Sequence, residues 1–422
     1  MGNEYLKRIS DDRLKLLLMA KGAVLIEGPK WCGKTRSAEE LAKSVLYMQD
    51  PDISKASMLT AKTKPSLLLE GDTPRLLDEW QVAPELWNAV RFAVDKRRSH
   101  GQFILTGSVV PDRTGEMHSG TGRIARMRMR TMSLCESGES TGEISLEKLF
   151  DGETDMGGSS RLSVEDLAFI INRGGWPEVV GEENEQIALA VASDYVEAIV
   201  NEDISKADGV DKNPDRVKRF LRSLSRNISN EARTTTILND MKANDETLSQ
   251  PTIDQYINAL KKIFVIEDLP AWSAKLRSKT AIRTTAKRHF TDPSIAAASL
   301  GATPAKLLSD LKTFGFLFES LAIRDLRVYA DSLDGSVCHY RDKSGLETDA
   351  IIQLADGRWG AVEVKLGAGE IESAAANLLK IERRIDTEEM NKPSFLMVLT
   401  GTEYATQMTN GVWIVPLGCL KR

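Results

Sequence analysis

Short apolar runs alternate with amphipathic stretches along the first third of the chain. Residues 23–26, 76–77 and 103–105 are short and apolar, as expected of strands that are buried on both faces of a parallel sheet. The stretches 35–43 and 84–98 carry apolar residues on one side and charged residues on the other, which predicts helices. Strands that alternate with helices predict an α/β domain built on a parallel sheet.

The middle of the chain has a different pattern. A polar, glycine-rich stretch at 151–160 is typical of a linker, and helical patterns follow it at 165–172, 185–200 and 214–229. Two short helices joined by a turn and followed by a strand are then expected at 237–241, 252–263 and 264–269. This order resembles a winged helix, although a plain helical scaffold would give the same pattern.

The last third predicts a helix, three strands, a helix and a strand, at 314–330, 337–340, 347–352, 359–366, 372–384 and 395–399. That is the core order of the PD-(D/E)xK nucleases, which have a restriction-endonuclease-like α/β fold. The chain is therefore expected to be an α/β multidomain protein. Its domains would be a parallel-sheet domain at 1–150, a helical and winged-helix-like domain at 160–285, and a nuclease-like domain at 286–422.

Composition limits the class of protein. A chain of 422 residues is too long for one core, and 41% hydrophobic with 28% charged residues is ordinary for a soluble globular protein. The net charge of −5 argues against a globally basic nucleic-acid binder. The four cysteines stand far apart without a CxxC pair, which indicates neither a zinc site nor a disulfide framework. No apolar run reaches the ~18 residues of a membrane span, and a cytoplasmic location without membrane contact is expected.

One segment between the first strand and the first helix has the spacing G-x-x-x-x-G-K-[ST] of a P-loop. Its residues are Gly28, Pro29, Lys30, Trp31, Cys32, Gly33, Lys34 and Thr35. The backbone N–H groups of such a loop and the positive end of the helix dipole bind a triphosphate. Lys34 would reach the β- and γ-phosphates, and the Thr35 hydroxyl would bind Mg²⁺. The first domain is thus expected to be a P-loop NTPase that uses ATP and Mg²⁺.

Several later residues could complete that site. After the apolar pair 76–77, Asp78 would hold Mg²⁺ through water and Glu79 would polarise the attacking water, although a solvated strand end has the same residues. The strand 103–105 leads into Thr106-Gly107-Ser108, where the hydroxyls of Thr106 and Ser108 would sense the γ-phosphate or the segment would simply form a turn. Arg123 is a candidate for an arginine that contacts the γ-phosphate.

A basic stretch lies between the middle and last thirds. From Leu269 to Thr291 there is no acidic residue, and the basic ones are Lys275, Arg277, Lys279, Arg283, Lys287 and Arg288. The stretch 275–288 could neutralise the phosphate backbone of DNA or RNA. A solvated loop is an equally good interpretation.

A second group of candidate residues lies in the nuclease-like part. Asp349 precedes Glu363-x-Lys365 by fourteen residues, and strand alternation places Glu363 and Lys365 on one face. Asp349 and Glu363, with Glu319 from the preceding helix, are oxygen ligands suited to Mg²⁺, and Lys365 would orient or deprotonate a water. Two alternatives stay open, namely a surface pair of strand residues and a nuclease fold without activity.

Taken together, the motifs resemble a prokaryotic family of AAA-type P-loop ATPases with a C-terminal domain of unknown function 4143. Beside the P-loop, the resemblance rests on the segments 77–81, 105–108, 120–123, 174–178, 202–204, 318–319, 340–341, 347–349 and 363–365. Arg36 and the Trp31-Cys32 pair depart from the usual loop sequence. The resemblance implies an ATPase domain, a winged-helix-like middle and a restriction-endonuclease-like end.

Two functions are compatible with these patterns. One is an ATP-hydrolysing protein whose nuclease-like domain acts on or near nucleic acid. The other is a STAND-like regulatory switch, in which ATP sets a conformation and an inactive C-terminal domain binds a partner.

Overall fold

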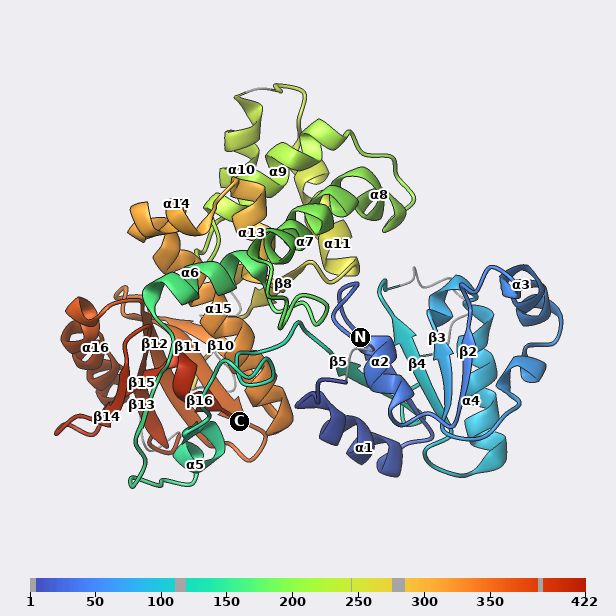
Figure 1. The fold of residues 1–422 in the computed structure, drawn as a ribbon, viewed down its shortest axis with the longest axis horizontal. Helices are drawn as coiled ribbons and strands as arrows, with labels where there is room; N and C mark the ends of the chain where they lie inside the picture. The colour runs from blue at the N-terminus through green and yellow to red at the C-terminus, as the bar shows by residue number, and fades with distance from the viewer. Residues whose placement is uncertain (1–4, 111–118, 244, 275–284, 386–389) are drawn as a thin grey trace. The chain divides into compact units, whose positions relative to one another are not determined.

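The fold is given by a computed structural model that describes residues 5–110, 119–243, 245–274, 285–385 and 390–422 (Figure 1). The chain forms two compact units. The first comprises Met1–Thr131, Ile204–Val210 and Ala259–Val265, and the second comprises Met132–Asp203, Asp211–Asn258 and Ile266–Arg422. The three-domain division expected from the sequence stays a prediction.

The first unit is built on a five-stranded sheet with the strand order β2-β3-β4-β1-β5. The strands are β1 (Ala23–Glu27), β2 (Ser44–Tyr47), β3 (Arg75–Asp78), β4 (Phe103–Gly107) and β5 (Ile124–Arg128). Every neighbouring pair is parallel, which confirms the parallel sheet predicted for this part of the chain.

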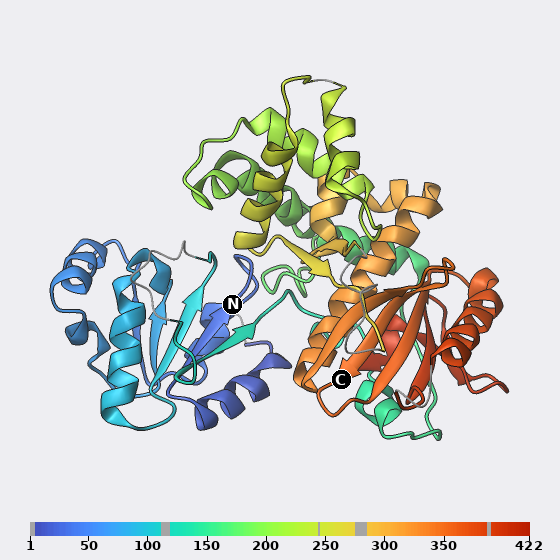
Figure 2. The ribbon, with the colours of Figure 1, turned by 180° about the vertical axis from the view of Figure 1, so that it is seen from behind.

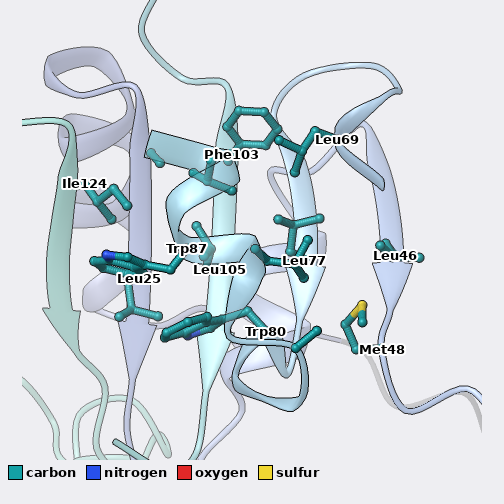
Figure 3. Close-up of a cluster of buried hydrophobic side chains, with 14 of the residues drawn as sticks. Leu25, Leu46, Met48, Leu69, Leu77, Trp80, Trp87, Phe103, Leu105 and Ile124 are labelled. Atoms are coloured by element: carbon teal, nitrogen blue, oxygen red, sulfur yellow. The ribbon is translucent and has the colours of Figure 1, made fainter. Parts of the chain in front are cut away.

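Helices cover both faces of this sheet, and strand alternation decides which residue meets which helix. The helices are α1 (Ser10–Ala20), α2 (Lys34–Glu39), α3 (Ser54–Thr63) and α4 (Glu85–Arg97). Leu25 and Leu105 point to the side of Trp87 from α4 (Figure 3), whereas Val24 packs with Leu14 of α1 on the other side. Because both faces are buried, the strands are apolar throughout rather than alternating. Helix α2 ends at Glu39, before the end expected from the sequence.

The second unit contains a seven-stranded sheet with the order β10-β11-β12-β13-β15-β14-β7. The strands of this unit are β6 (Ile144–Ser145), β7 (Gly158–Ser159), β8 (Ile266–Leu269), β9 (Lys287–Phe290), β10 (Gly335–Arg341), β11 (Glu347–Leu354), β12 (Trp359–Lys365), β13 (Phe395–Thr400), β14 (Tyr404–Gln407), β15 (Trp413–Pro416) and β16 (Leu420–Lys421). The main helices are α5 (Leu146–Phe150), α6 (Val164–Arg173), α7 (Glu185–Ala198), α9 (Pro214–Arg226), α10 (Thr234–Lys242), α13 (Pro293–Leu300), α14 (Pro304–Ser309), α15 (Leu311–Ser332) and α16 (Ile371–Arg384).

The C-terminal elements follow the order expected from the sequence. Helix α15 precedes the antiparallel strands β10, β11 and β12, and α16 connects β12 to β13, which pairs with it in parallel. Helices α15 and α16 lie on opposite sides of this sheet (Figures 1 and 2). Trp359 and Ala361 of β12 pack against Leu378 of α16, so these residues fix one face of the strand that also carries Glu363 and Lys365.

The polar stretch 151–160 is not a linker in the structure. Its residues Gly158–Ser159 form β7, where Ser159 pairs with Tyr404 of β14. Just before it, the ring of Phe150 lies 5.0 Å from that of Phe395. An edge strand needs only backbone N–H and C=O groups, which is why a glycine-rich polar sequence can form one.

The middle part has the predicted order of two helices and a strand. Helix α10 is followed by α11 (Gln250–Lys262) and then by β8, which pairs in antiparallel fashion with β9. The resemblance of this arrangement to a winged helix remains a prediction. Among the described residues, no helix is both long and apolar enough to cross a membrane.

A buried guanidinium group joins four segments of the second unit. Arg324 of α15, whose side chain is 1% exposed, pairs with Asp292 at 3.1 Å and with Asp325 at 2.8 Å. The same carboxylates accept hydrogen bonds from two backbone groups, since Asp292 accepts from Gly175 N and Asp325 from Leu134 N, both at 2.9 Å. This cluster connects α13 and α15 to the segments around 134 and 175.

The segment 174–176 fits closely beside this cluster. A Cβ atom on Gly175 would lie 2.2 Å from the carbonyl oxygen of Met132, so only glycine fits there. The buried Trp176 donates from Nε1 to Ser294 Oγ at 3.1 Å. The glycine-tryptophan motif of the sequence therefore has a packing role.

Removal of the buried guanidinium should destabilise the second unit much more than removal of an exposed one. We expect Arg324→Met to lower the free energy of unfolding by about 3–5 kcal/mol, because two buried carboxylates lose their cation. The control is Arg358→Met, whose ion pair with Asp151 is 42% and 55% exposed and which should change stability by about 0–1 kcal/mol. Urea denaturation followed by circular dichroism measures both, and equal losses would contradict this role for Arg324.

Candidate functional site

The P-loop follows β1 and packs closely against the segment that directly follows β5. A Cβ atom on Gly28 would lie 2.1 Å from the carbonyl oxygen of Met129, so the loop needs glycine at its start. Gly33, at the other end, has φ 98°, and Trp31 has φ 63°. Left-handed residues in such a loop turn successive N–H groups toward one concavity, which suits an anion.

Two further side chains hold this loop. Arg8, whose side chain is buried, donates from Nη1 to the carbonyl oxygen of Cys32 at 2.7 Å. The Lys34 ammonium donates to the carbonyl oxygens of Gly28 at 3.1 Å and Pro29 at 2.7 Å. Lys34 is therefore directed into the loop, while the side chains of Lys30 and Trp31 are exposed.

Thr35 and Asp78 meet at the carboxyl edge of the parallel sheet. Thr35 Oγ1 donates to Asp78 Oδ1 at 2.7 Å, although 43 residues separate them. Thr106, at the end of β4, donates to the same oxygen at 2.7 Å and accepts from Glu79 N at 3.1 Å. A hydroxyl and a carboxylate held this close at a P-loop are the donor set expected for Mg²⁺.

The carboxylate of Glu79 is held by two polar side chains. Ser108 donates to Glu79 Oε2 at 3.0 Å, and Gln81 Nε2 donates to the same oxygen. Glu79 itself has φ 52°, a left-handed conformation that is uncommon for a residue other than glycine and often found at functional sites. The structure thus brings Asp78, Glu79 and Ser108 to one place.

Gln81 belongs to this site but had no role assigned from the sequence, and Thr106 was expected there as a γ-phosphate sensor rather than as a partner of Asp78. Both stand within motifs that the sequence does present, at 105–108 and 77–81. Their contacts depend on β3 and β4 being neighbours in the sheet, which the local pattern does not specify.

Arg123 lies at the amino ends of the strands, whereas the P-loop lies at their carboxyl ends. Its carbonyl oxygen accepts from Ala23 N at 3.1 Å, at the start of β1, whereas the P-loop follows the end of that strand. The Arg123 side chain pairs with Asp95 at 2.8 Å. Because the strands are parallel, a residue that precedes β5 lies at the opposite end of the sheet from a loop that follows β1. Arg123 therefore does not contribute to this site within the chain.

In the second unit, the structure brings Asp349, Glu363 and Lys365 together. Lys365 Nζ lies 3.2 Å from Glu363 and 3.9 Å from Asp349. Asn377 of α16 donates to Glu363 at 2.8 Å, and the backbone N–H of Val364 donates to Asp349 at 2.8 Å. The strand alternation predicted from the sequence thus gives the expected grouping.

Lys287 of β9 is an additional member of this cluster. Its ammonium lies 3.3 Å from Glu319 Oε1 and 3.5 Å from Asp349 Oδ1, and the three side chains are 9%, 12% and 15% exposed. In the sequence, Lys287 stands out only as part of the basic stretch. Its ion pairs connect β9 to α15 and β11.

Burial and mutual repulsion alter the charges of this cluster. Burial, with the charge of Asp349, raises the pKa of Glu319 to about 8 and that of Glu363 to about 7. Burial alone would lower the pKa of Lys287, but the charges of Glu319 and Asp349 outweigh it and raise that pKa. Burial would likewise lower the pKa of Lys365, but the charges of Asp349 and Glu363 raise it, so both lysines stay charged.

The donor atoms of the predicted C-terminal metal site already have partners. Both oxygens of Asp349, both of Glu363 and one of Glu319 contact nitrogen atoms of the protein. Over the described part of the chain, no group of three or more His, Cys, Asp or Glu side chains is arranged to hold a metal ion. As arranged, these residues do not fit Mg²⁺.

Most of the basic stretch, from Lys275 to Arg283, lies outside the described residues. Of the two described members, Lys287 binds the carboxylates above. Arg288 lies 3.6 Å from Asp268 and donates to the carbonyl oxygen of Ala232 at 3.0 Å. These two cations are therefore engaged within the protein.

Three protein families match successive parts of the chain. Residues 20–137, which contain the P-loop and Asp78, match the AAA domain. The chain carries an AAA-type ATPase domain. Residues 164–306 match a domain of unknown function (DUF8612), and residues 314–420 match a second one (DUF4143), as the sequence motifs implied for the C-terminal domain. ATP binding follows from the first of these matches.

Similar proteins add little about function. Uncharacterized proteins of Mycobacterium tuberculosis and Mycobacterium bovis are each 22% identical over 361 residues, which is 85% of this chain and 74% of theirs. A Walker-type ATPase of Pyrococcus abyssi is similar at 14% identity and a TM-score of 0.41, over 70% of this chain and 96% of its own. A score this low has no bearing on the function of the chain.

Loss of the Lys34 ammonium should weaken ATP binding. We expect Lys34→Ala to raise the Kd about 10- to 100-fold, since hydrogen bonds to charged groups contribute about 1.5–3 kcal/mol. Lys43→Ala is the control, because Lys43 is an exposed lysine beyond the end of α2 and its loss should change the Kd much less. Equilibrium titration with a fluorescent ATP analogue compares them, and an unchanged Kd for Lys34→Ala would refute the role assigned to this lysine.

Proposed function

We propose that the first unit hydrolyses ATP at the carboxyl edge of its parallel sheet. The observation that supports this most directly is the hydrogen-bonded group of Thr35, Asp78 and Thr106, beside Lys34 and Glu79. It combines a P-loop with an acidic strand end, which together provide phosphate binding, metal binding and a base.

In this proposal each residue has a separate task. The loop N–H groups and the Lys34 ammonium bind the phosphates, and Thr35 and Asp78 hold Mg²⁺. That ion, when bound, offsets the charge that develops on the β- and γ-oxygens. Glu79 orients the attacking water. Ser108 donates to Glu79 and senses the γ-phosphate.

Hydrolysis should separate from binding when Glu79 is changed. We expect Glu79→Gln to retain ATP but to lose turnover by on the order of 10²-fold, as for the loss of a general base. Glu85→Gln, at the exposed start of α4, is the control and should keep both. A phosphate-release assay at saturating ATP decides this, and a Glu79→Gln protein with the wild-type rate would place the base elsewhere.

For the second unit, two functions are in play. The order of its C-terminal elements and the grouping of Asp349, Glu363 and Lys365 support a nuclease-like domain that acts on or near nucleic acid. The engaged carboxylate oxygens favour the second candidate, an ATP-dependent switch whose C-terminal domain binds a partner without cleaving it.

A cleavage assay separates these candidates. The purified protein is incubated with Mg²⁺ or Mn²⁺, with and without ATP, on single-stranded, duplex and branched DNA and on RNA. A nuclease should give products that disappear in Lys365→Ala, while ATP binding persists. The switch gives no Lys365-dependent product on any of these substrates, and such a product would exclude it.

A further inference from the structure

The C-terminal cluster contains a cation that belongs to the protein. Lys287 Nζ lies within 3.5 Å of oxygens of both Glu319 and Asp349, which come from different elements. These are two of the three residues whose chemistry suits a divalent metal. The ammonium comes from β9, whereas Glu319 comes from α15 and Asp349 from β11.

We propose that Lys287 is a built-in cation that takes the place of a divalent metal between Glu319 and Asp349, so that this cluster binds metal only when Lys287 is removed. The inference deepens the second candidate function, because a cluster closed by lysine is suited to hold the domain together rather than to activate water. It is independent of the ATPase proposal.

Two observations support it. The Asp349 carboxylate is fully occupied, since one oxygen contacts Lys287 and the other accepts from Val364 N and lies near Lys365. The exposed fractions of Lys287 and Glu319 are small, so water offers little screening between a bound metal and the ammonium. A metal at this point would therefore have to displace Lys287 from two carboxylates at once.

The position of Lys287 also explains why it stays in place. Lys287 is fixed on a strand, where it pairs with Leu269 of β8 in the antiparallel ladder. Its neighbour Arg288 is held by Asp268 and the carbonyl oxygen of Ala232. The strand thus holds the Cα atom of Lys287 beside Glu319 and Asp349, and the ammonium can leave these carboxylates only by rotation about its own side-chain bonds.

The test uses the full chain in the absence of nucleotide. Mn²⁺ is the probe, and bound Mn²⁺ is counted from the loss of the free-ion EPR signal. The variants are Lys287→Met, the conservative Lys287→Arg, and Lys343→Met as a control at an exposed lysine. We expect Lys287→Met to bind one Mn²⁺ per chain more than wild type. The other two should match wild type. The additional Mn²⁺ should be lost when Asp349→Asn is combined with Lys287→Met.

Thermal unfolding gives a second readout. Mn²⁺ should raise the Tm of Lys287→Met and leave the Tm of Lys287→Arg unchanged relative to wild type, because ligand binding stabilises the folded state by mass action. If Lys287→Met does not fold, the double variant Lys287→Met/Glu319→Gln removes the ammonium together with its carboxyl partner and still offers Asp349 and Glu363.

Wild-type protein supplies the decisive comparison. Mn²⁺ bound to wild type and lost in Asp349→Asn alone would overturn the inference, as would an unchanged Mn²⁺ count in a folded Lys287→Met protein. Neither result bears on the Glu79 experiment, so a failure here is distinguishable from a failure of the ATPase proposal. A Lys365-dependent cleavage product would instead contradict the switch directly.

Discussion

A buried charge needs a partner, and the second unit depends on that constraint. The desolvation of a lone charge is so unfavourable that buried ionic groups occur paired or bound to hydrogen-bond donors. Arg324 forms ion pairs with two carboxylates, which also accept hydrogen bonds from backbone N–H groups. These contacts hold four segments together. Lys287 does the same for Glu319 and Asp349. Scaffold and candidate site thus follow one electrostatic rule.

The first unit depends on a constraint of topology. In a parallel sheet the ends of all strands point the same way, so loops that are distant in sequence share one edge. β4 lies between β1 and β3, and Thr106 at its end contacts Asp78, which in turn accepts from Thr35 of the P-loop. The same rule separates Arg123 from the site, because Arg123 precedes its strand rather than following it.

The two candidate sites differ in how closed they are. In the ATPase site the Lys34 ammonium donates to two backbone carbonyl oxygens, which are neutral and can be exchanged for phosphate oxygens. In the C-terminal cluster Lys287 and Lys365 contact carboxylates, and each such pair would have to be separated before another ion could enter. This difference is why we propose hydrolysis at the first site and favour a structural or partner-binding role for the second.

Local pattern was enough for much of this protein. The local sequence predicts the P-loop, the strand that ends in Asp78, and the order of elements from α15 to β13. Each of these depends on the spacing of residues within a single segment of the chain. The polar stretch that forms β7, the contacts of Gln81 and Thr106, and the edge on which Arg123 lies depend on which strands become neighbours. The sequence alone determined the candidate residues of both sites. Only the tertiary structure decided that Lys287 closes the second one, because an ion pair between residues 32 and 62 positions apart is set by packing and not by periodicity.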